Sequence, residues 1–119
     1  MEDFRKEQKE ALEVLLEFNE RIVKNLGILE KELSGQRLDD TNKFIKGIVD
    51  AINWEVQVMN GTMDLLNEGR ERINKVEYNE KLTEFSNAIA SKNDARMAES
   101  VRALIPLFEK LGSAAKEVI

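Results

Sequence analysis

The chain has 119 residues, of which 42% are hydrophobic and 34% are charged, and its formal net charge is −5. This length suits a single domain covering residues 1–119, and the apolar fraction is too high for a disordered chain. Basic residues are interspersed with acidic ones, which disfavours both nucleic acid and anionic membranes as partners.

The first predicted element is a helix over residues 3–34, which ends before Gly35. Its heptad seam has gaps that alternate between four and three residues: Gln8, Leu12, Leu15, Asn19, Ile22, Leu26, Leu29 and Leu33. Asn19 is a polar residue in the middle of this seam, a position that often sets helix pairing. In one interpretation Asn19 bonds within the monomer or turns to solvent, and in the other it contacts a partner.

A second helix is predicted over residues 40–68, with Asp39 or Asp40 as its cap. Its seam is uninterrupted by polar residues: Ile45, Val49, Ile52, Val56, Met59, Met63 and Leu66. The pair Asn60-Gly61 is a turn signal, but the seam stays in phase through it. We therefore predict one continuous helix, with a break at this pair as the alternative. Glu55 lies at the edge of the seam, where we expect its stem to pack and its carboxylate to reach water.

The third helix is predicted over residues 74–91, where Leu82, Phe85 and Ile89 have helical spacing. Residues 69–78 do not settle on one pattern, so this stretch is a loop, a short helix or an extension of its neighbours. The boundary between the second and third helices stays open at this point.

The fourth helix is predicted over residues 94–118, after a turn in which Asn93 or Asp94 is the cap. Its seam is a regular heptad pattern: Met97, Val101, Leu104, Phe108, Leu111, Ala115 and Val118. Pro106 lies inside and is expected to kink the helix. Gly112-Ser113 is a place where a final turn can separate.

These elements together predict an all-α fold. Four amphipathic helices with short connections favour an antiparallel up-down four-helix bundle, built from two helical hairpins. β-Branched residues do not alternate with polar ones over any long stretch, so strands are not expected.

The sequence contains no cysteine and no histidine. This removes thiolate chemistry and zinc–thiolate sites, and it removes the commonest general base and metal ligand. Carboxylate metal sites in helical bundles usually include a histidine, and no calcium-binding or phosphate-binding loop is present. We therefore expect no catalytic residue, no metal site and no cofactor, and we expect that the protein is not an enzyme.

A candidate partner-binding surface lies on the predicted 40–68 helix. Gly47, Trp54 and Gly61 are seven residues apart along one line of the helix, beside a row that includes Phe44 and Val58. Two glycines that flank a tryptophan allow another helix or peptide to approach closely, and tryptophan is enriched at binding hot spots. In the alternative, Trp54 fills the bundle and the glycines serve its internal packing. The candidate residues are Trp54, Gly47, Gly61, Phe44, Val58 and Asn19.

Two segments resemble a known family. The stretch from Asn87 to Asp94, continuing to Ala98 and through Leu104-Ile105-Pro106-Leu107-Phe108-Glu109, resembles the C-terminal hairpin of an uncharacterised family of small bacterial all-helical proteins, a domain of unknown function. The segment 44–66, with Gly47, Ile52 and Trp54, is similar to the preceding long helix of that family. The resemblance covers about two thirds of the chain and departs from the family's pattern at Arg96, Ser100 and Arg102. It implies a helical fold and no particular function.

The sequence therefore favours a non-enzymatic protein-interaction module, an adaptor or a small chaperone that presents an apolar groove between helices. The alternatives are a structural homodimer with no separate ligand and a small-ligand carrier with an internal cavity. The partner is expected to be an unknown protein or a second copy of the chain. No stretch approaches the length of a membrane span or a signal peptide, so we expect a cytoplasmic bacterial protein.

Overall fold

The computed structural model describes residues 2–119 and contains five helices and, within those residues, no strand. The helices are α1 (Glu2–Leu33), α2 (Thr41–Gly61), α3 (Met63–Leu66), α4 (Lys75–Ser91) and α5 (Asp94–Val118). The all-helical prediction is confirmed, but the predicted number of four helices is wrong, because a short fifth helix follows α2.

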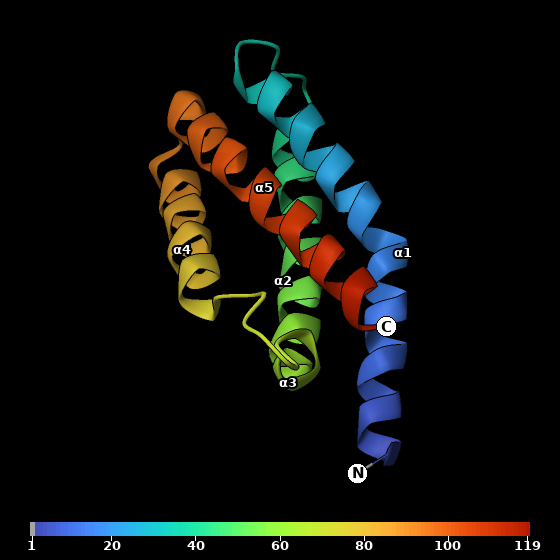
Figure 1. Cartoon of the computed structure of the whole chain (residues 1–119). Helices are drawn as coiled ribbons and strands as arrows, with labels where there is room; N and C mark the ends of the chain where they lie inside the picture. The colour runs from blue at the N-terminus through green and yellow to red at the C-terminus, as the bar shows by residue number, and fades with distance from the viewer. Residues whose placement is uncertain (1) are drawn as a thin grey trace.

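The helices form an elongated body with extents of 49 × 24 × 19 Å (Figure 1). α5 lies between α1 and α4 and packs extensively against both. α2 packs on α1, whereas α2 and α4 have little or no direct contact. α2 therefore has two sides outside the core. One forms a common surface with α1, and the other faces α4 without packing on it.

The predicted seam of the first helix is buried in the structure. Leu12, Leu15, Leu26 and Leu29 have no exposed surface, and the polar residues Gln8 and Asn19 are buried with them. The seam of α5 is buried in the same way except for Val118, which is half-buried, and the helix continues through Pro106 and Gly112. Periodic apolar residues thus place α1 and α5 in the core, as simple burial of hydrophobic area requires.

The seam of α2 is rotated from the predicted one. The residues of α2 that are buried are Thr41, Ile45, Ile48, Ile52, Glu55 and Met59. Val49, Val56 and Met63, which the sequence pattern assigned to the seam, are only half-buried. The gaps of the observed seam still alternate between four and three residues. A charged residue therefore occupies a core position.

The predicted continuity of the 40–68 helix is wrong, because α2 ends at Gly61 and α3 begins at Met63. The Thr62 hydroxyl donates to the Val58 carbonyl at 2.7 Å, and its backbone N–H donates to the Met59 carbonyl at 3.1 Å. The side chain of Gln8 donates to the Gly61 carbonyl at 3.1 Å. These bonds pair the carbonyls at the helix end, so the chain can turn without leaving them unsatisfied.

The connection between α3 and α4 is a loop held by the hydrogen bonds of one side chain. The amide of Asn67 accepts from the backbone N–H groups of Arg72 and Ile73 at 2.8 and 2.9 Å, and it donates to the Ile73 carbonyl at 3.0 Å. Ile73 is 1% exposed. Asn74 then caps α4, and Asn93 caps α5 by accepting from the Arg96 N–H at 3.0 Å.

Candidate functional site

Two aromatic rings meet on the outer surface where α1 and α2 pack. Phe18 and Trp54 have ring centroids 5.6 Å apart and an interplanar angle of 80°, and their side chains are 40% and 38% exposed. The guanidinium of Arg21 lies 5.7 Å from the centroid of the Phe18 ring, within the range of a cation–π interaction. An aromatic pair in this geometry is an ordered feature that a partner can contact without first rearranging it.

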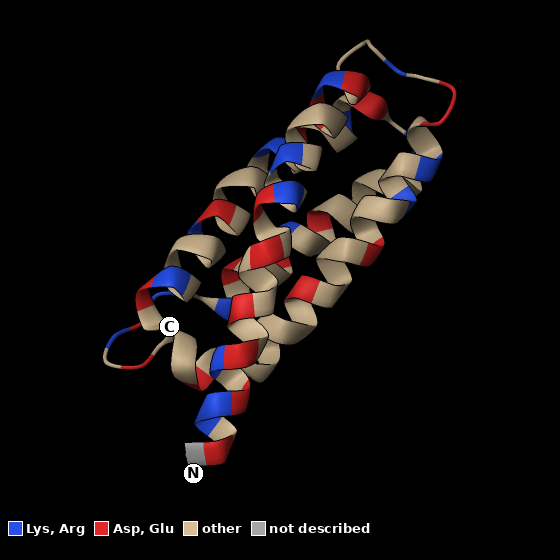
Figure 2. Ribbon diagram, turned by 90° about the vertical axis from the view of Figure 1, so that its right-hand side faces the viewer, with Lys and Arg blue, Asp and Glu red and all other residues tan. Residues whose placement is uncertain are grey.

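Apolar residues extend this pair along both helices. We call the surface the α1–α2 face and define it by Val14, Phe18, Arg21, Asn25, Ile28, Phe44, Gly47, Ala51, Trp54, Val58 and Gly61. Val14 and Ile28 are 42% and 40% exposed, and Phe44 and Val58 are half-buried. Only four of the 21 residues of α2 are charged, and its ribbon is largely tan where Figure 2 shows it beside α1. The face is thus a continuous apolar stripe two helices wide.

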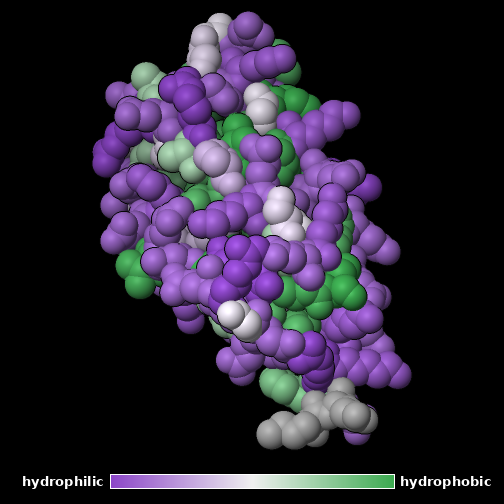
Figure 3. All heavy atoms as spheres, in the orientation of Figure 1, coloured by the Kyte–Doolittle hydropathy of each residue, from purple (hydrophilic) through white to green (hydrophobic). Residues whose placement is uncertain are grey.

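The face contains a shallow hollow of about 440 Å³, whose lining residues are Phe18, Arg21, Ile22, Asn25, Ala51 and Trp54. A hollow of this size accommodates a few side chains of a docking helix rather than a whole ligand. In the orientation of Figure 1, Figure 3 shows a largely hydrophilic surface interrupted by patches of hydrophobic residues.

The two glycines of the face are not required by packing within the monomer. A Cβ atom at Gly47 or at Gly61 would meet no atom within 4 Å. Glycine inside a helix costs about 1 kcal/mol relative to alanine, so the open position at Gly47 gives no reason for this glycine inside one chain. The bare backbone at both positions leaves room for another molecule to approach.

The structure brings five of the six predicted site residues to one side of α2, while Asn19 lies elsewhere. Asn19 is 6% exposed, and its Nδ2 donates to the Phe108 carbonyl at 3.0 Å. A second, longer bond of 3.4 Å joins Nδ2 to Oε2 of Glu55. Asn19 is therefore bonded within the monomer. Phe18 and Arg21, which the sequence pattern did not single out as site residues, are the residues that sequence reasoning missed.

Glu55 does not reach water as expected, because its side chain is 0% exposed. Its Oε1 has no hydrogen-bond partner among residues 2–119. Burial raises the pKa of the Glu55 carboxyl to about 7, and the bond from Asn19 opposes this shift only in part. The expectation failed because Glu55 is in phase with Ile52 and Met59, so the helix directs it inward whatever its charge.

Tyr78 brings α4 to this buried polar cluster. Its hydroxyl donates to the Leu107 carbonyl at 2.6 Å, and its ring makes an edge contact with Phe108 at 6.4 Å. Burial raises the pKa of the Tyr78 hydroxyl, and the carboxylates of Glu77 and Glu55 raise it further. The cluster connects α1, α2, α4 and α5.

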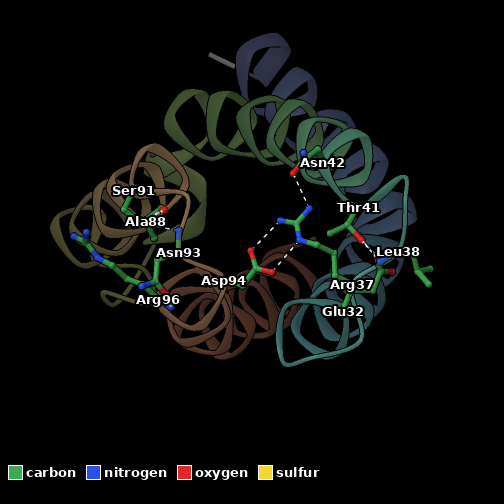
Figure 4. A network of polar contacts seen from close by, with 10 residues as sticks. All are labelled: Glu32, Arg37, Leu38, Thr41, Asn42, Ala88, Ser91, Asn93, Asp94 and Arg96. Carbon is green, nitrogen blue, oxygen red and sulfur yellow. Dashed lines mark hydrogen bonds and ion pairs between the residues drawn. The ribbon is translucent and has the colours of Figure 1, made fainter.

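A second hollow, of about 760 Å³, lies on the open side between α2 and α4. Figure 4 shows Arg37 across one end of it, where the guanidinium donates to both carboxylate oxygens of Asp94 and to Asn42, each at 2.9 Å. The hydrogen bonds from Arg37 lower the pKa of Asp94. The polar residues at this end are paired with one another, so the α1–α2 face remains the better candidate for binding.

A comparison with known families gives one match. The family described as "Domain of unknown function (DUF8042)" matches residues 10–114. No curated protein and no solved structure matches the chain. Separately, no helix within residues 2–119 is both long and apolar enough to cross a membrane.

Proposed function

The chain belongs to this family of unknown function, which confirms the resemblance seen in its sequence, and we propose that it is a non-enzymatic protein-interaction module of the bacterial cytoplasm. In this proposal the four long helices act as an antiparallel bundle of two hairpins. The bundle is a rigid support, and its α1–α2 face receives a helix of another polypeptide, as an adaptor or a small chaperone does.

The observation that carries the proposal is the exposed contact between Phe18 and Trp54. Contiguous apolar surface is uncommon on a small monomer and marks interaction sites when polar residues surround it. Aromatic residues and arginine are the types most enriched at the centre of such sites. Two aromatic residues and one arginine meet here, since Phe18 contacts Trp54 and Arg21 lies over the ring of Phe18.

The open backbone at Gly47 adds support of a different kind. No atom of the monomer comes within 4 Å of the place where its Cβ would be. Helices approach most closely where one of them lacks side chains, so this line of α2 fits a helical partner better than a loop.

Replacing Trp54 with alanine is expected to abolish capture of the partner while the helical circular dichroism spectrum stays unchanged. The reason is that Trp54 is 38% exposed at the centre of the face, where a partner can cover the rest of its ring. Tagged wild-type and Trp54→Ala chains are compared in pull-downs from the native host and against a differently tagged copy of the chain itself.

Val76→Ala is the matched control, because Val76 is a 63% exposed apolar residue of α4, away from the face. Its pull-down should equal that of the wild type. Equal loss in both variants, or retention in both, contradicts the proposal. Loss of helicity in Trp54→Ala would instead assign this side chain to the core.

A further inference from the structure

We propose that the occupant of the α1–α2 face is a second copy of this chain, docked antiparallel about a two-fold axis that lies in the plane of the face and crosses both helices. The inference rests on the proposed function, since it uses the same face. It is carried by a row of charges on α1 and by the matching of large and small residues on α2.

The charged row borders the apolar stripe of α1 on its outer flank. Glu10, Glu17, Lys24 and Lys31 are seven residues apart, so they follow one line along the helix. All four are exposed, and in the part of the chain that the structure describes none of them forms an ion pair. The sign of the row changes once, from negative in its first half to positive in its second.

When a second copy of this row runs in the opposite direction, each charge lies opposite a charge of the other sign. An antiparallel copy places Glu10 opposite Lys31 of the second copy and Glu17 opposite Lys24 of the second copy. The two pairings share one midpoint, between residues 20 and 21, and the two-fold axis repeats both of them. A parallel copy in register would place glutamate on glutamate and lysine on lysine. Flanking charges set helix orientation in this way in coiled coils, and self-complementarity is the mark of a two-fold interface.

The same axis also brings large residues of α2 in one copy opposite small residues of α2 in the other. The contact of Phe18 with Trp54 puts these residues at one level, so an axis between residues 20 and 21 of α1 crosses α2 near Ala51. The reversal then brings Trp54 of one copy over the stretch between Gly47 and Ala51 of the other. Phe44 comes opposite Val58. The bulkiest side chain thus meets the most open backbone of the face.

The size of the face suits a stable pair. A stripe as long as α2, at 1.5 Å per residue, and two helices wide covers about 32 by 20 Å, or roughly 600 Å². A standard interface buries about 800 Å² per partner in accessible surface, which exceeds the flat footprint because side chains interdigitate. The face is therefore comparable in size with one side of a standard interface.

The test exchanges the charges in two variants. Glu10→Lys/Glu17→Lys makes the row wholly positive, and Lys24→Glu/Lys31→Glu makes it wholly negative. Sedimentation velocity should show that the wild type dimerises and that each variant alone dimerises about tenfold more weakly or worse, because like charges then oppose each other. An equimolar mixture of the two variants should recover the wild-type affinity, since each of the four pairings then again joins one lysine and one glutamate.

Glu80→Lys/Glu84→Lys is the matched control, because it makes the same change of charge on exposed residues of α4. It should dimerise like the wild type. A wild-type chain that stays monomeric at about 100 µM overturns the inference, and so does a dimer whose two charge variants fail to recover on mixing. A monomer that captures a different protein through Trp54 also overturns it, while leaving the proposed function intact.

Discussion

The free energy of unfolding is expected to fall by about 3 kcal/mol as the pH rises from about 4.5 to 8, because of Glu55 alone. Burial raises the pKa of its carboxyl from 4.5 in the unfolded chain to about 7 in the fold. The folded state therefore binds the proton more tightly than the unfolded state does. The stabilisation is complete below pH 4.5 and is lost as the pH passes through 7.

The measurement is urea unfolding of the wild type and of Glu55→Gln over this pH range. Glutamine keeps the shape and stays neutral, so the variant should become more stable than the wild type by about 3 kcal/mol at pH 8, with a difference that shrinks toward acidic pH. Glu68, Asp94 and Glu117 have lowered pKa values because of their arginine partners, and they act in the opposite direction. These three residues are present in both the wild type and Glu55→Gln. The difference in unfolding free energy between the two proteins therefore reports on Glu55.

Glu99→Gln is the control for this experiment, since Glu99 is exposed on α5. Its stability should follow that of the wild type at every pH. Parallel curves for Glu55→Gln and the wild type would show that the carboxyl is hydrated in solution, and the burial described for it would be incorrect.

Replacing Gly112 with alanine is expected to destabilise the fold by about 2 kcal/mol or more. A Cβ atom there would lie 2.3 Å from Oδ1 and 3.1 Å from Cγ of Asn19. The asparagine is short and its amide is held by the Phe108 carbonyl, so it cannot move aside without breaking that bond. Thermal and urea unfolding of the single variant measure the loss.

Gly47→Ala is the matched comparison, because Gly47 is also a helical glycine but has open space at its Cβ. It should stabilise the monomer by about 1 kcal/mol through helix propensity. In an Asn19→Ala background the substitution at Gly112 should lose most of its effect, which a double-mutant cycle detects. A gain of stability for Gly112→Ala in the wild-type background would show that Asn19 does not occupy this place.

These two experiments concern the buried cluster, yet they bear on the surface. Asn19 and Phe18 are neighbours on α1, and Glu55 and Trp54 are neighbours on α2. The bond between Asn19 and Glu55 inside the bundle and the ring contact outside it are therefore two sides of one helix pairing. Disturbing the cluster should shift the level at which the two rings meet.

Much of the helical framework was predictable from the sequence because its signal is local. The periodic apolar residues of α1 and α5 decide which side of each helix is buried, and the caps at Asn74 and Asn93 act on the next few residues. The line of Gly47, Trp54 and Gly61 was likewise visible as a pattern, and its role in binding stays a prediction.

Tertiary structure decided three further features through residues distant in the chain. The sequence left a break at Asn60-Gly61 as an alternative, and the bond from Gln8 to the Gly61 carbonyl, across 53 residues, supports the end of α2 there. Phe18 becomes part of an aromatic pair only because α2 brings Trp54 beside it. Glu55 is buried although a carboxylate favours water, because Asn19 and the helices packed around Glu55 cover its side chain. The polarity of a residue in the sequence indicates whether its side chain favours water. The neighbours that the tertiary structure packs against that side chain decide whether it reaches water.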